Sequence, residues 1–282
     1  MTQRHVDDGS VLVNVLVVLA LASSVVVATL GLSDAAIRRS QTYAEAGAAR
    51  AILDGAEASA IAALRRDLRE APGEDHLREA WAQIGQDEIE IEGGRFRLRI
   101  TDAQARFNLN SLPQGGALAA QTLARIVALT DLPADTAARI RAAALRGPIA
   151  DLSALADTAG IDAEAVSLLS PFVTVLPGAS PLNVNTMPDD LFPAIASNVA
   201  EARLLQGLRA RRGWLAPADL SAAGIILPPI AGYRSDYFLV EAEVTVGETS
   251  VGQTSLLQRV SAPGEVARVV VLSRRRASVE GN

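Results

Sequence analysis

Residues 11–32 read VLVNVLVVLALASSVVVATLGL and contain no charged side chain. A helix needs about 20 apolar residues to cross the hydrocarbon core of a bilayer, so this run is long enough to span a membrane. It continues without a turn signal into residues 33–70, which lack proline and are rich in helix-forming alanine, leucine, arginine and glutamate. Pro72 and Gly73 then end the pattern. We therefore predict one long helix, with a membrane-spanning half at residues 10–32 and an amphipathic rod at residues 33–70.

The rod carries apolar residues at roughly helical spacing, while arginine and acidic side chains occupy its other faces. The outer half of the rod is expected to pack on the protein's own domain. The inner, apolar half is expected to pack on lipid or on other such helices. The apolar positions are Ala36, Ile37, Ala44, Ala48, Ala51, Ile52, Ala56, Ala60, Ile61 and Leu64.

Two other interpretations of the apolar run are a cleaved secretory signal and a plain membrane anchor. A secretory signal has a shorter apolar region, about 7–15 residues, followed by a small-residue cleavage site. Here the run is longer, and the only leader-like feature, residues 1–9, precedes it. A plain anchor stays open on hydropathy alone. The charges on the two sides of the run do not decide its orientation.

The composition of the 282 residues limits the possible chemistry. The chain has no cysteine, which rules out disulfides and thiolate metal sites. The formal net charge of −6 gives no overall attraction to nucleic acid. No histidine follows residue 76, and the sequence contains no nucleophile elbow and no glycine-rich phosphate loop. We expect a protein that is not an enzyme.

A β-hairpin is predicted where residues 88–92 and 95–100 flank Gly93 and Gly94. With a Gly-Gly turn, one face carries opposed charges and the other is apolar. The apolar face should bury against the rod helix, because two strands alone are marginally stable. The expected pairs are Glu92 with Arg95, Glu90 with Arg97, Glu88 with Arg99, Ile91 with Phe96 and Ile89 with Leu98.

Further strands are predicted far away in the chain, at residues 237–246, 255–260 and 266–272, because glycines and prolines punctuate runs of β-formers there. The sheet is thus split between two distant parts of the sequence. We predict an α+β fold whose sheet-bearing unit comprises residues 71–111 and 230–282. The intervening residues 112–229 form a large, all-helical insertion.

The insertion contains an internal repeat, with units at about 107–175 and 182–229. Four matching elements keep their order, which indicates two copies of a small bundle resembling sterile-alpha-motif or helix-hairpin-helix units. Asp151 and Asp219 are expected to precede short apolar helices in the same way. The matching pairs are residues 107–113 with 182–188, 138–140 with 202–204, 150–154 with 218–222, and 160–161 with 224–225.

Each unit opens on an Asn-x-Asn element, Asn108 and Asn110 in the first, Asn183 and Asn185 in the second. Paired amides could bind a sugar or a metal. Asparagine side chains more often cap helices and close turns, and we favour that structural role here. The arginines of the second unit could bind DNA phosphates, but its Gly213-Trp214 is not the hairpin of DNA-binding versions. We therefore expect no nucleic acid.

Residues 9–14, GSVLVN, resemble the processing site of type IV pilins and type II secretion pseudopilins. The resemblance implies cleavage by a prepilin peptidase between Gly9 and Ser10, and methylation of the new N-terminus at Ser10. These families usually have glutamate at the fifth mature position, where this chain has Asn14. The absence of this glutamate is characteristic of the K family of type II secretion minor pseudopilins, which Asn14 therefore suits. Nearly the whole chain resembles that family, including residues 102–110, 182–186 and 235–238.

The resemblance implies a minor pseudopilin at the tip of the pseudopilus that supports export of folded proteins across the outer membrane. It implies the minor pseudopilins I and J and the major pseudopilin G as partners. It places a single-pass anchor in the inner membrane and the globular part in the periplasm. Calcium binding in the sheet domain is a property of some members, and no ligands are assigned to the nearby Asp236, Glu241 and Glu243. The alternatives are a minor pilin of a type IV pilus or DNA-uptake system, and an unprocessed anchored interaction protein.

Overall fold

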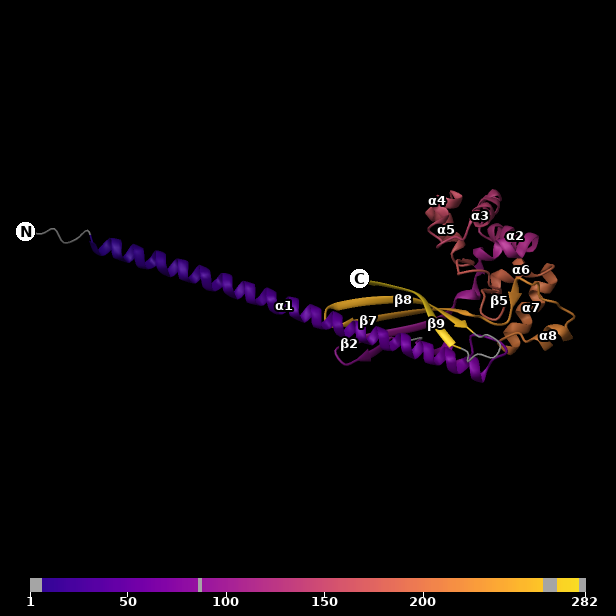
Figure 1. The fold of residues 1–282 in the computed structure, drawn as a ribbon, viewed down its shortest axis with the longest axis horizontal. Coiled ribbons are helices and arrows are strands. Elements are labelled where there is room, and N and C mark those ends of the chain that lie inside the picture. The colour runs from indigo at the N-terminus through magenta and orange to yellow at the C-terminus, as the bar shows by residue number, and fades with distance from the viewer. Residues whose placement is uncertain (1–6, 86–87, 261–267, 279–282) are drawn as a thin grey trace, which may run out of the picture.

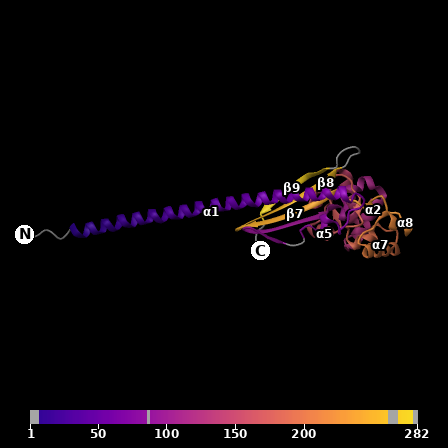
Figure 2. The same cartoon turned by 90° about the horizontal axis from the view of Figure 1, so that it is seen from below.

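A computed structural model of the chain describes residues 7–85, 88–260 and 268–278. Its parts are a long rod helix, a sheet beside the C-terminal half of that rod, and a helical lobe (Figure 1). This long helix is α1, Asp7–Glu70, which contains both the predicted membrane span and the predicted rod, and all of it is here called the rod. Figure 2 shows that the lobe lies at the end of the molecule opposite the N-terminus, beyond the sheet. The predicted α+β architecture with a helical insertion is confirmed.

The outer half of α1 packs on the sheet through one stripe of small and apolar residues, as predicted. The stripe differs in detail from the prediction, since Ala48 and Ala51 are exposed. Alanine is too weakly hydrophobic and too frequent along this helix to mark the face by itself. The fully enclosed positions recur every three or four residues: Ala49, Leu53, Ala56, Ala60 and Leu64.

The sheet has five antiparallel strands in the order β1-β2-β7-β8-β9, so two distant parts of the sequence meet at the β2–β7 pair. Strand β7 has the predicted bounds, whereas β8 begins earlier than predicted. The third predicted strand corresponds to β9, and its first two residues, 266 and 267, lie outside the described residues. The strands are β1 Ile89–Ile91, β2 Gly94–Asp102, β7 Tyr237–Val246, β8 Thr249–Val260 and β9 Arg268–Ser278.

The hairpin forms, but its predicted strand pairing is wrong by two residues, because the turn begins one residue earlier than predicted. Ile91 lies opposite Gly94, and Glu90 lies opposite Arg95, so Glu92 and Gly93 make the turn. Gly93 takes the left-handed φ of 77°, which favours glycine. Gly94 instead belongs to β2, where an added Cβ would lie 1.7 Å from the carbonyl oxygen of Thr245 on β7. The close approach of the two backbones therefore assigns the second glycine to the strand.

The shift leaves the two faces of the hairpin as predicted, since Ile89 now faces Phe96 on the apolar side. On the charged side Glu88 forms ion pairs with Arg95 and Arg97, at 3.2 and 3.5 Å. The predicted Glu88–Arg99 pair is wrong. These pairs are exposed and each contributes little to stability.

The lobe is mainly helical, but the prediction of an all-helical insertion is wrong in one respect. Two-residue parallel strand pairs, β3–β4 and β5–β6, close the first and second units. A two-residue strand leaves no alternation of polar and apolar residues for sequence to show. The first unit contains α2 Leu112–Leu129, α3 Asp135–Arg146, α4 Leu155–Ala159 and α5 Ala163–Leu169, between β3 Phe107–Asn108 and β4 Val173–Thr174. The second contains α6 Phe192–Ile195, α7 Val199–Arg212 and α8 Pro217–Ala222, between β5 Leu182–Asn183 and β6 Ala231–Gly232.

The buried positions of the two units match one residue away from the match that the sequence suggests. Ile140 of α3 is buried, and its counterpart by burial on α7 is Leu205, not the exposed Leu204. The two aspartates also differ, contrary to prediction. Asp151 precedes α4 and accepts a hydrogen bond from the Ala154 amide three residues on. Asp219 lies inside α8 and accepts one from the Ala216 amide three residues back.

Short 3-10 turns complete the described elements. The first lies between α1 and β1, the second between β2 and β3, the third between β3 and α2, and the fourth between β5 and α6. These turns are η1 Ala80–Gln83, η2 Ala103–Ala105, η3 Leu109–Ser111 and η4 Asp189–Leu191.

Candidate functional site: the anchor helix and the junction of the lobe

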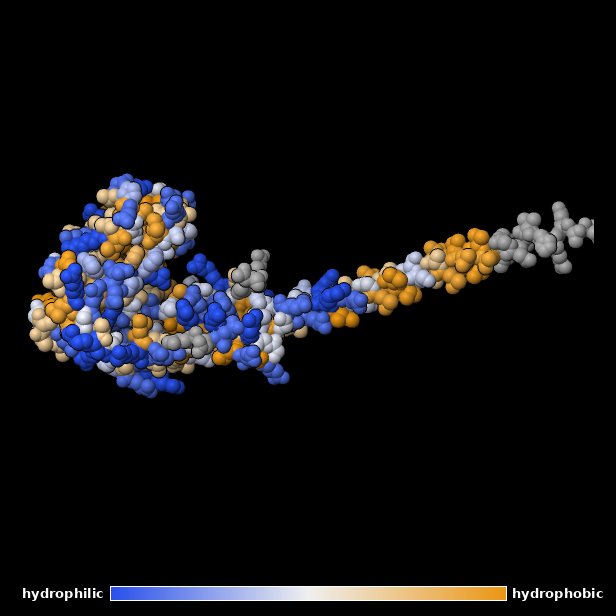
Figure 3. Space-filling model, turned by 180° about the vertical axis from the view of Figure 1, so that it is seen from behind, coloured by the Kyte–Doolittle hydropathy of each residue, from blue (hydrophilic) through white to orange (hydrophobic). Residues whose placement is uncertain are grey.

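The N-terminal half of α1 stands free of the rest of the molecule. Every side chain described from Leu12 to Ala44 is exposed, and the helix is long and apolar enough to cross a membrane. Figure 3 shows the hydrophobic surface on the free part of the rod. Gly9 and Ser10 lie within the helical span, and Asn14 is exposed on it. An isolated apolar helix of this length needs lipid or other helices around it.

The Asn-x-Asn elements hold the lobe together, as the structural interpretation predicts. The amide oxygen of Asn108 accepts the backbone N–H of Asn110, and that of Asn183 accepts the N–H of Asn185. Asn110 then clamps Ile149, because its side chain accepts from the Ile149 amide and donates to the Ile149 carbonyl, at 2.9 and 3.0 Å. All of these groups are buried. The side chains of Asn108 and Asn110 thus form hydrogen bonds with backbone groups where the chain turns.

The second unit repeats this clamp. Asn185 accepts from the Leu215 amide at 2.7 Å and donates to the Leu215 carbonyl at 3.1 Å. Ile149 and Leu215 each lie two residues after the glycine that follows α3 or α7. The duplicated asparagines therefore fasten duplicated loops, which explains their spacing without a bound ligand.

Asn183 has a further role, because it joins the lobe to the sheet. Its fully buried amide group donates to the Asp102 carboxylate at the end of β2 and to the Ser235 hydroxyl, both at 2.9 Å. Thr186 and Ser235 also donate to Asp102, at 2.5 and 2.6 Å. Burial raises the pKa of Asp102 to about 6, although these hydrogen bonds oppose that shift. Three segments distant in sequence thus converge on one carboxylate.

Arg259 of β8 joins the rod to the loop that follows it. The buried guanidinium pairs with Asp67 of α1 and with Asp75, and it lies over the Phe238 ring at 4.3 Å. Asp75 in turn accepts the Ser235 amide at 2.7 Å. Buried charges need such partners, since an unpaired one is strongly destabilising. Together with the contacts of Asp102, these bonds form a continuous polar junction between rod, sheet and lobe.

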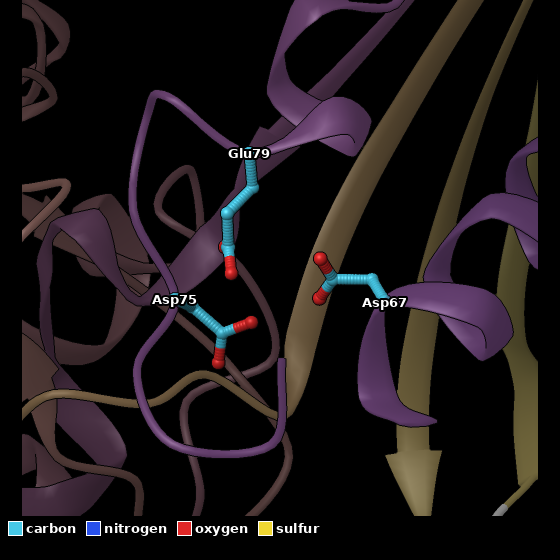
Figure 4. A group of neighbouring side chains, drawn as sticks. All are labelled: Asp67, Asp75 and Glu79. Atoms are coloured by element: carbon cyan, nitrogen blue, oxygen red, sulfur yellow. The ribbon is translucent and has the colours of Figure 1, made fainter. Parts of the chain in front are cut away.

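Glu79 completes a group of three buried carboxylates with Asp67 and Asp75, shown in Figure 4. One oxygen of Glu79 accepts from the His76 amide and the Trp81 indole, at 2.9 and 2.8 Å. Its other oxygen is buried and has no hydrogen-bond partner. Burial raises the pKa of Glu79 to about 7. Protonation is therefore available to this group near neutral pH.

Among the described residues, these three carboxylates are the group that lies close enough together to hold a metal ion. Arg259 already supplies positive charge to Asp67 and Asp75, so the group does not present a free set of ligands. The residues considered for calcium from the sequence do not join it. Glu241 and Glu243 are exposed on the open face of the sheet. Calcium therefore remains an expectation from resemblance, without ligands assigned.

The sequence analysis did not find the polar junction. Its members come from five separate segments, around residues 67–75, 102, 183–186, 235 and 259, and only the fold brings them together. One signal was present in the sequence. Arg259 is a charged residue that lies two positions after Leu257 in the same strand, and Leu257 is fully buried. A charge at such a position predicts a buried partner.

Comparison with known proteins identifies the family. No protein-family model matches the chain. A protein of Klebsiella pneumoniae named "Type II secretion system protein K" is 30% identical, over 91% of this chain and 94% of its own length. This chain belongs to the type II secretion system protein K family. Proteins of the same name from Pectobacterium carotovorum and Pseudomonas aeruginosa are 26% and 29% identical, over 90% and 96% of this chain.

A solved structure shares the fold. It is described as the GspK-GspI-GspJ complex from the type 2 secretion system of enterotoxigenic Escherichia coli, and the similar chain is 22% identical to this one. The match has a TM-score of 0.64 and covers 86% of this chain and all of that one. At this identity the likeness supports the architecture of rod, sheet and helical insertion. The relatives of the protein K family are named as components of a secretion system, not as enzymes.

Proposed function

We propose that this protein is a minor pseudopilin at the tip of the type II secretion pseudopilus, where it supports export of folded proteins across the outer membrane. The observation that carries this proposal is the position of the lobe. It lies beyond the sheet, at the end of the molecule opposite the anchor (Figure 2). A subunit stacked on that end would collide with the lobe, whereas subunits below it meet only the rod.

Asn14 supports the same position. In shaft subunits the glutamate at the fifth mature position is thought to pair with the N-terminal amine of a neighbour inside the membrane. A carboxylate in lipid is costly without such a partner, so the pairing favours ordered addition. Asn14 cannot make that ion pair, and it lies on an exposed face of the free helix. A subunit that starts or ends a filament has least need of this contact.

The proposed partners are the minor pseudopilins I and J and the major pseudopilin G, packed along the rod. The complex with GspI and GspJ described for the similar Escherichia coli chain supports the first two. The anchor would cross the inner membrane once, with the sheet and lobe in the periplasm. This role is structural and requires no reaction beyond processing of the chain by a prepilin peptidase.

Mass spectrometry of the membrane-extracted protein tests the proposal at the N-terminus. The expected mature chain begins at Ser10 and is methylated there. Replacing Gly9 by a bulkier residue should leave the leader attached. An intact Met1, or a cut within the apolar helix, would instead identify an unprocessed anchored protein. A gene neighbourhood of pilus components, with normal processing, would favour the minor pilin of a type IV pilus or DNA-uptake system.

A further inference from the structure

A groove runs between the lobe and the open face of the sheet, the face opposite α1. It consists of three hollows of about 770, 530 and 650 Å³. Each hollow shares lining residues with the other two, so they form one continuous surface, here called the lobe groove. Figure 3 shows a notch in the molecular surface between the lobe and the sheet. The shared residues are Arg106 and Leu239, Arg99 and Glu241, and Thr254 and Arg275.

The floor of the groove is built from residues that lie directly opposite one another across four strands. A row with two central leucines, next to the lobe, is followed by a charged row two residues further along each strand. The leucine row is Thr101, Leu239, Leu256 and Ser273. The charged row is Arg99, Glu241, Thr254 and Arg275.

The two arginines of the charged row have no bonding partner within the described part of the chain. Arg99 and Arg275 are exposed, and neither forms a hydrogen bond or ion pair with another described residue. Glu241 lies opposite Arg99 but does not form an ion pair with it. A hydrogen bond from the Ser153 side chain lowers the pKa of Asp151 on the lobe, and the charge of Arg275 helps to lower it, although the Arg275 and Asp151 side chains are not bonded. The chain as a whole is acidic, with a net charge of −6. The two arginines therefore supply local positive charge on a protein whose net charge gives little general attraction for anions.

The separation of these arginines suggests the size of what they bind. They are three strand spacings apart, which is about 14 Å at 4.8 Å per spacing. An extended chain covers that distance in about four residues at 3.3 Å each. Side chains at positions i, i+2 and i+4 of an extended segment point to the same side. Carboxylates at i and i+4 would thus reach Arg99 and Arg275, while i+2 faces the middle of the floor.

We propose that the lobe groove binds an extended segment of an exported protein, of the pattern acidic-x-apolar-x-acidic. The two carboxylates pair with Arg99 and Arg275, and the apolar side chain leans onto Leu239 and Leu256. Glu241 repels a third acidic group at the centre, which makes the pattern selective. The choice of an exported protein rests on the proposed function. Neighbouring subunits are assigned to the rod, whereas this groove faces away from it.

Binding of a labelled peptide, Glu-Ala-Leu-Ala-Glu, to the full chain in detergent micelles tests the groove. Arg99→Ala and Arg275→Ala should each weaken binding about tenfold. Arg211→Ala, which removes an exposed arginine of α7 outside the groove, should leave it unchanged. Arg275→Glu should lose the peptide and regain binding of Glu-Ala-Leu-Ala-Arg. Equal affinity for the glutamine version of the peptide, or no loss in either alanine variant, would overturn the proposal.

Export in cells separates this proposal from the tip function. The Arg99→Glu, Arg275→Glu double variant should assemble pseudopili normally but secrete less of proteins that carry the segment. Loss of pseudopilus assembly would show that the groove receives another subunit, which would overturn the cargo proposal and leave the tip function standing. Peptide binding by a protein that never enters a pseudopilus would overturn both the tip function and the choice of an exported protein. Normal export by the double variant would overturn the cargo proposal alone.

Discussion

At the scale of single residues, the molecule depends on a few buried charges rather than on its many exposed arginines. Arg259 links Asp67 of the rod to Asp75 of the following loop, with all three side chains buried. Asp102 links the sheet to the lobe through Asn183. Neither charge lies near the membrane anchor. Their effect is to fix how the lobe is carried on the rod.

Replacing Arg259 by methionine should therefore strongly destabilise the protein. The change leaves the Asp67 and Asp75 carboxylates buried and unpaired, which costs about 3–5 kcal/mol. Urea unfolding of the full chain in detergent measures this loss. Arg66→Met, on the exposed side of α1, is the matched control and should change stability by less than about 0.5 kcal/mol. Adding Asp67→Asn and Asp75→Asn to Arg259→Met should recover part of the loss; no recovery would mean that packing rather than charge matters.

Ionisation of Glu79 should lower the free energy of unfolding as pH rises. Its pKa is about 7 in the folded state, above the ordinary value of 4.5, because burial disfavours the charged form. The folded state thus holds a proton that the unfolded state releases, and this stabilisation declines between about pH 4.5 and 7. Glu79→Gln should be relatively more stable above pH 7, by at most about 3 kcal/mol. His76, whose pKa burial lowers, has the opposite slope, so the comparison is made between variant and parent at each pH. A constant difference from pH 5 to 8 would contradict the assignment.

At the scale of elements, sequence patterns predicted those parts that depend on local order. The long helix and strand β7 were predicted because their periodicity is regular. The hairpin register was not, since the choice between Gly93 and Gly94 depends on the backbone of Thr245, far away in sequence. The polar junction was not predicted either, because its partners are brought together only by the fold. Local patterns identify helices and strands, and long-range contacts determine the register in which the strands pair.

The asparagine clamps allow a test at this scale. Asn110→Ala leaves the Ile149 amide and two buried carbonyls without their partner, at a cost of about 3 kcal/mol. Hydrogen exchange should accelerate in the first helical unit, especially at Ile149, while the sheet stays protected. Asn198→Ala, which removes an exposed helix cap at α7, should cost only about 1 kcal/mol and affect the second unit. Uniform loss of protection would show that the lobe and sheet unfold together.

At the scale of the whole molecule, the anchor and the lobe lie at opposite ends of one rod (Figure 1). Contacts along the rod and contacts at the tip are therefore separable, because they use different surfaces. The sheet packs on the outer half of α1 and leaves the inner half bare. This arrangement lets other subunits pack along the anchor end of the rod. The lobe and the lobe groove stay accessible at the opposite end.

The number of copies in each pseudopilus tests that arrangement. If the lobe blocks stacking, one molecule per filament is expected, at one end. Excess protein should then give shorter or fewer filaments, because each added copy starts or ends one. Asn14→Glu restores the missing carboxylate but leaves the lobe in place, so the variant should keep the same position. Quantitative labelling of pseudopili overproduced from the same operon measures both. Label spread evenly along the shaft would show that subunits stack past the lobe, and the steric argument for the tip would then fail.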